Sequence, residues 1–74
     1  MSVARILERC AADLDAEAKA LRAFADRRWE RGDKAGSDHR HREATGYART
    51  AAAVRALATG DLATILDAVR AMSR

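Results

Sequence analysis

The sequence predicts an all-α protein, and two features of its composition carry that prediction. Alanine accounts for 19 of the 36 apolar residues, and alanine has the lowest free-energy cost of any residue inside a helix. The chain contains no proline, so no residue forces a break within a helix. Leu, Ile, Val and Phe together number only 12, so the core is expected to be thin and to need very regular helix packing or a partner. At this length a single helical domain over residues 1–74 is expected.

A first, long helix is predicted over residues 2–31 by apolar residues at steps of mostly three and four, which places them on one face. Arginines in the last turn suit the negative end of the helix dipole, and Gly32 provides a stop. Glu17 interrupts the stripe. It is interpreted either as an acid paired with an arginine of a facing helix, such as Arg55, or as the edge of the stripe. The stripe consists of Val3, Ile6, Leu7, Cys10, Leu14, Leu21 and Phe24, with Trp29 one position off it.

Residues 32–38 hold two glycines, a serine and two aspartates, which is the chemistry of a turn. Ser37 or Asp38 is the expected cap of a second helix over residues 38–59. Most of its apolar stripe is small, and small residues let two helix backbones approach closely. The stripe comprises Ala44, Tyr47, Ala48, Ala51, Val54, Leu57 and Ala58.

A third helix is predicted over residues 61–73, after a stop at Gly60 and a cap at Asp61. Its face is the densest cluster of large aliphatic side chains in the chain: Leu62, Ile65, Leu66, Val69 and Met72. The first helix is expected to fold in a hairpin against the two shorter ones, so that Val3, Ile6 and Leu7 meet the third helix and Phe24 meets Tyr47. Either the three helices close a small bundle, or the third-helix face also packs on a second chain in a homodimer.

The basic residues gather at the predicted hairpin tip. Residues 27–42 carry six basic and three acidic groups, which equals the net charge of +3 for the whole chain. Such a patch binds nucleic-acid phosphates or an acidic protein surface; the alternative is that these are solvated helix ends. Trp29 is interpreted either as an interface residue or as a ring that closes the core against Tyr47. The candidate partner-binding residues are Arg27, Arg28, Trp29, Arg31, Lys34, Arg40 and Arg42.

No motif indicates catalysis, a cofactor or a metal. His39 and His41 lie two residues apart, so on a helix they point to different faces and do not converge on an ion. The single cysteine, Cys10, cannot form an internal disulfide, which is typical of a reducing cytoplasm. No stretch approaches the ~20 apolar residues that cross a bilayer. These observations predict a non-enzymatic cytoplasmic protein without a membrane partner.

In its small size, its alanine- and arginine-rich composition and its lack of catalytic motifs, the chain is similar to small phage-encoded inhibitors of the anti-CRISPR type. That resemblance implies a protein of a bacterial or phage-infected cell that sterically blocks a host protein or protein–nucleic acid complex, here through the basic tip. Two other functions remain open. One is a small nucleic-acid-binding or regulatory protein that uses the same patch, and the other is a structural subunit that docks through the Leu62–Met72 face.

Overall fold

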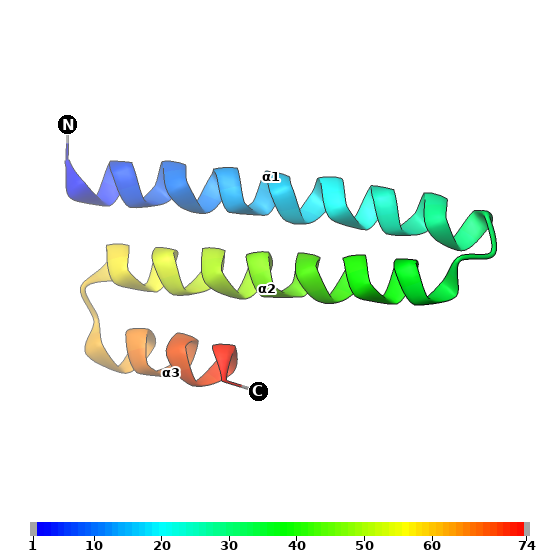
Figure 1. The fold of residues 1–74 in the computed structure, drawn as a ribbon. Helices are drawn as coiled ribbons and strands as arrows, with labels where there is room; N and C mark the ends of the chain where they lie inside the picture. Colours follow the sequence, from blue (N-terminus) through cyan, green and yellow to red (C-terminus); the bar gives the residue numbers. More distant parts are fainter. Residues whose placement is uncertain (1, 74) are drawn as a thin grey trace.

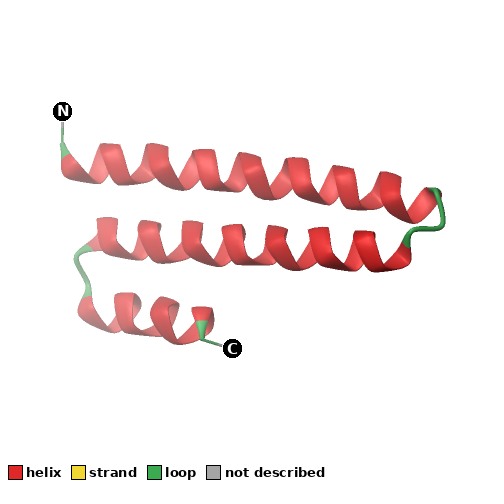
Figure 2. Cartoon of the chain, in the orientation of Figure 1, coloured by secondary structure: helices red, strands yellow, loops and turns green. Residues whose placement is uncertain are grey.

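Three helices make up almost all of residues 2–73, the part of the chain that this computed structural model describes (Figure 2). They are α1 (Val3–Glu30), α2 (Lys34–Thr59) and α3 (Leu62–Met72), and there is no strand within this range. The all-α prediction is confirmed. Helices α1 and α2 form a long antiparallel hairpin, and α3 turns back along the outer side of α2 for part of its length (Figure 1).

The hairpin turn is shorter than the sequence predicts. Asp33 is the N-cap of α2, and its carboxylate accepts a hydrogen bond from the backbone N–H of Gly36 at 2.9 Å. The prediction that Ser37 or Asp38 caps this helix is therefore wrong. Because Asp33 supplies the cap, α2 begins at Lys34 instead of residue 38, and only residues 31–33 connect the helices. Gly32 takes the left-handed conformation (φ 82°) that this tight connection requires.

A stripe of small residues forms the α1–α2 interface. On each helix its members are seven residues apart, which is two turns, so they lie on one face. All six are at most 1% exposed: Ala11, Ala18 and Ala25 on α1, and Ser37, Ala44 and Ala51 on α2. Small side chains let the two backbones approach closely. No large apolar side chain is fully buried among the described residues.

The larger apolar side chains of α1 were predicted to be the packed stripe, and this is wrong for several of them. Val3 is 71% exposed and Ile6 is 45% exposed. Cys10, expected on the packed face, is also exposed. The alanines occupy the line of closest approach, so the larger residues flank the contact.

Helix α3 packs against α2 alone, and within residues 2–73 it makes no contact with α1. The prediction that Val3, Ile6 and Leu7 meet the third helix is therefore wrong, because α2 lies between α1 and α3 (Figure 1). The Cα trace measures 44 × 28 × 9 Å, so the chain is a flat layer one helix thick. None of the residues of α3 is buried.

The start of α3 is expected to be sensitive to acid. The Asp61 carboxylate accepts hydrogen bonds from the Thr64 hydroxyl (2.5 Å) and the Thr64 backbone N–H (3.0 Å), and these lower its pKa below the ordinary value of 3.8. A lowered pKa in the folded state means that the cap stabilises α3 fully above the unfolded-state pKa and is lost as pH falls through the folded-state pKa. Acid titration followed by NMR should show the Thr64 amide keeping its hydrogen-bonded shift until the pH falls below the ordinary Asp pKa of 3.8 and losing it only at lower pH. Asp61→Asn keeps a cap that does not titrate, so in that variant an unchanged acid transition at Thr64 would contradict this assignment.

Candidate functional site

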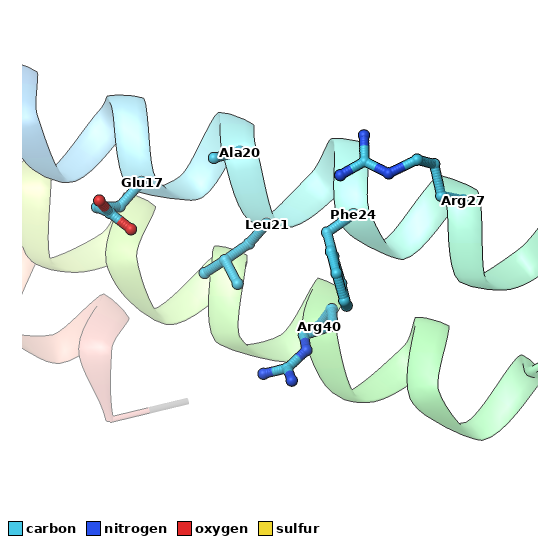
Figure 3. Close-up of a pocket in the computed structure, with 6 residues that line it drawn as sticks. All are labelled: Glu17, Ala20, Leu21, Phe24, Arg27 and Arg40. Atoms are coloured by element: carbon cyan, nitrogen blue, oxygen red, sulfur yellow. The ribbon is translucent and has the colours of Figure 1, made fainter.

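Three arginine side chains surround the ring of Phe24 near the hairpin tip. Their guanidinium carbons lie 5.0 Å (Arg28), 5.3 Å (Arg40) and 5.6 Å (Arg27) from the ring centroid, within cation–π range. Arg27 and Arg28 follow Phe24 by three and four residues and so are its neighbours on the surface of α1. Arg40 reaches the same ring from α2 (Figure 3). We call Phe24, Arg27, Arg28 and Arg40 the arginine cluster.

The cluster keeps an excess of positive charge. Arg28 pairs with Asp33 at 3.4 Å, and Arg40 pairs with Glu43 at 2.7 Å. Glu43 is also shared with His39, at 2.8 Å. Arg27 has no carboxylate within ion-pair distance among residues 2–73 and is exposed. Since two carboxylates face three guanidinium groups, the cluster attracts anions, and Arg27 is the group with spare hydrogen-bond donors.

A shallow open groove leads from the cluster along the hairpin. Leu21 and Phe24 supply its apolar side, Arg27 and Arg40 lie at one end, and Glu17 lies at the other (Figure 3). Glu17 is exposed and does not pair with Arg55, so that interpretation is wrong. The groove therefore combines an apolar strip with an aromatic ring and arginines at one end, and aromatic residues and Arg are residue types enriched in protein interfaces.

Arg55 instead bridges α2 to two acids of α1. Its side chain lies 2.6 Å from Asp15 and 3.5 Å from Glu8, and the hydrogen bond to Asp15 raises the pKa of Arg55. Asp15 follows the buried Ala11 by four residues, whereas Leu21, which lines the groove, follows the buried Ala18 by three. These steps rotate to opposite sides of the contact line, so the groove and the Arg55 ion pairs lie on opposite faces of the layer.

The same geometry divides the predicted basic tip. Trp29 follows buried Ala25 by four residues and therefore lies on the face of Arg55, where the Lys34 ammonium is 5.9 Å from its ring. Arg27, Arg28 and Arg40 gather on the other face. Arg31 and Arg42 are exposed, and their side chains make no ion pair, hydrogen bond or ring contact with other described residues. The seven predicted residues thus form two small surfaces and two isolated arginines.

Trp29 is 57% exposed, so the interpretation that its ring closes the core against Tyr47 is wrong. The expected pairing of Phe24 with Tyr47 is wrong too, because the two rings line different grooves. Tyr47 shares its groove with Leu14, Glu43, Gly46 and Thr50. The sequence reasoning missed Phe24 as the centre of the cluster. The signal was there in part, because Phe24, Arg27 and Arg28 have the spacing of helical neighbours.

The histidines contact separate carboxylates. His39 lies 2.8 Å from Glu43, and His41 lies 3.6 Å from Asp26 of α1. No group of three His, Cys, Asp or Glu side chains within residues 2–73 is placed to hold a metal ion.

No helix in the described part of the chain combines the length and the apolar character that crossing a membrane requires. Comparison with protein-family models, curated proteins and solved structures finds no match to this chain.

Proposed function

We propose that this chain is a non-enzymatic protein whose arginine cluster binds an anionic surface of a macromolecular partner. The observation that carries the proposal is the convergence of three guanidinium groups, from two helices, on one aromatic ring beside an open groove. Arg and aromatic side chains are enriched in protein interfaces. The ring and the two carboxylates hold the guanidinium groups in place, which lowers the entropy lost on binding.

The shape of the molecule favours this use of the tip. Helix α3 covers only part of the length of α2, so beyond its end the α1–α2 hairpin continues alone (Figure 1). A two-helix projection with a charged end can enter a recess of a partner while the three-helix end stays outside. Binding of this kind blocks a surface by occupying it and requires no chemistry from the chain.

The partner we propose is a host protein or protein–nucleic acid complex in the bacterial cytoplasm, blocked in the manner of phage-encoded inhibitors. This part of the proposal depends on the resemblance in size and composition to anti-CRISPR-type proteins. Nucleic acid alone is the main competing ligand, because the same guanidinium groups pair with phosphates.

A tagged pull-down from a bacterial lysate, with and without nuclease treatment, tests the proposal. A discrete protein that remains bound after nuclease treatment, and is lost from a variant with Arg27, Arg28 and Arg40 changed to glutamate, is the expected result. Recovery that disappears with nuclease contradicts a protein partner and assigns the cluster to nucleic acid. In that case log affinity should fall linearly with log salt concentration, with a slope set by the phosphates contacted.

A further inference from the structure

The groove beside the arginine cluster carries opposite charges at its two ends. Arg27 lies at one end and Glu17 at the other, and both side chains are exposed (Figure 3). Arg40, the other cation at the groove, is already paired with Glu43 at 2.7 Å. Within residues 2–73 neither Arg27 nor Glu17 has a partner for an ion pair. The groove therefore leaves one cation and one anion, at opposite ends, whose charges no described residue balances.

The distance between these two charges sets the size of the ligand. Glu17 and Arg27 are ten residues apart on α1, and at 1.5 Å per residue this is about 15 Å along the helix. Between them lie Leu21 and Phe24, both half-buried, which form an apolar strip. A small anion reaches only the arginine end. A ligand that uses the whole groove has an acidic group, apolar groups and a basic group in that order over about 15 Å.

The walls of the groove favour a helical ligand. They belong to α1 and α2, whose backbone N–H and C=O groups are bonded within each helix. An extended peptide laid over the apolar strip would find no main-chain partners there, and burying its own backbone groups unpaired is unfavourable. A helix satisfies its backbone groups internally. Its side chains, at steps of three and four residues, also match the three-residue step from Leu21 to Phe24.

We infer that the groove binds an amphipathic helix of the partner protein, with an acidic residue at Arg27 and a basic residue at Glu17; this inference rests on the function proposed above. Apolar side chains of that helix pack on Leu21 and Phe24. Nucleic acid fits the groove less well, because its regularly spaced phosphates place an anion against Glu17, and like charges across an interface are unfavourable. The groove thus selects the order of charges along the partner helix as well as the sign of charge at the tip.

Three synthetic peptides of about 18 residues test the inference by fluorescence anisotropy with the full chain at low salt. All are alanine-based helices with leucines at steps of three and four residues in the middle. The mixed peptide has glutamates at one end and lysines at the other, about ten residues apart. The acidic peptide has glutamates at both ends. The third is the mixed peptide with a central proline, which breaks the helix.

The wild-type chain should bind the mixed peptide about three to ten times more tightly than the acidic one, the difference between an attractive and a repulsive exposed pair. Net charge alone predicts the reverse, because the chain carries +3. Glu17→Lys should reverse the preference. The matched control is Asp38→Lys, which makes the same change in net charge at an exposed residue on the side of α2 where His41 lies, opposite the groove. It should keep the wild-type preference, and the proline peptide should bind about tenfold more weakly than the mixed peptide.

An acidic peptide that binds the wild-type chain as tightly as the mixed peptide overturns the inference, as does a proline peptide that binds equally well or the absence of binding by all three. Equal behaviour of Glu17→Lys and Asp38→Lys overturns it too. None of these results affects the proposed function, which the pull-down tests through Arg27, Arg28 and Arg40. A partner that is lost from the arginine variant but fully retained by Glu17→Lys would support the cluster and reject the groove as the place of a mixed-charge helix.

Discussion

Replacing Ala18 with leucine is expected to lower the free energy of unfolding by roughly 1–3 kcal/mol, the usual cost of overpacking a close-packed contact. Ala18 is 1% exposed and belongs to the stripe along which α1 and α2 approach each other. Leucine is a good helix former, so helix propensity does not cause this loss. The added side chain has to push the two backbones apart along the whole hairpin. Urea denaturation followed by circular dichroism measures the change.

Ala16→Leu is the matched control, because it makes the same substitution two residues away at an exposed position of α1. It is expected to change stability by less than about 0.5 kcal/mol. Both variants have to be compared at one protein concentration, since association adds to the apparent stability of the folded chain. Equal losses in the two variants would mean that the alanine stripe is not the line of contact.

Changing Arg27, Arg28 and Arg40 together to glutamate is expected to weaken partner binding at least tenfold. Interface arginines at hot spots contribute about 2 kcal/mol or more each, and about 1.4 kcal/mol corresponds to a tenfold change. In the wild-type chain Asp33 pairs with Arg28 and Glu43 pairs with Arg40. The variant places new carboxylates beside these two acids, so it reverses the sign of the charge of the cluster. Retention of the partner in the pull-down, quantified against wild type, is the measurement.

The control for this variant changes Arg5, Arg9 and Arg22 to glutamate. These arginines are exposed on α1 outside the cluster, and the net charge changes by the same amount. Circular dichroism establishes that both variants keep their helices. If the control loses the partner as completely as the cluster variant, overall charge drives binding and the cluster is not the site.

Much of the local structure follows from the sequence. High alanine content and the absence of proline predict the helices, and Gly32, Gly60 and Asp61 mark ends that the structure places within a residue or two of the prediction. These signals act over one turn of chain, so they need no tertiary information. The start of α2 was predicted four residues late, because residues 32–38 contain three candidate caps, Asp33, Ser37 and Asp38, and residue types alone do not decide which cap is used.

That error has consequences for the site. A three-residue connection instead of seven shifts the register of α2 against α1, and this register brings Arg40 onto Phe24 and separates Phe24 from Tyr47. The spacing of three and four residues was enough to predict that Arg27 and Arg28 are neighbours of Phe24 on the surface of one helix. The contribution of Arg40, and the separation of Trp29 and Lys34 onto the other face, depend on the register and the handedness of the pair.

The sequence by itself determined that the chain is helical, roughly where its helices end and that its charge lies at one end. Only the tertiary structure decided which stripe each helix buries. On α1 the helical spacing of the apolar residues fits a stripe of large side chains and a neighbouring stripe of alanines about equally well, so spacing alone does not say which stripe is buried. Close approach of two backbones favours the alanines, because short side chains let the helices pack along their whole length. The large side chains are then left beside the contact on a single layer of helices, and no local signal in the sequence specifies that arrangement.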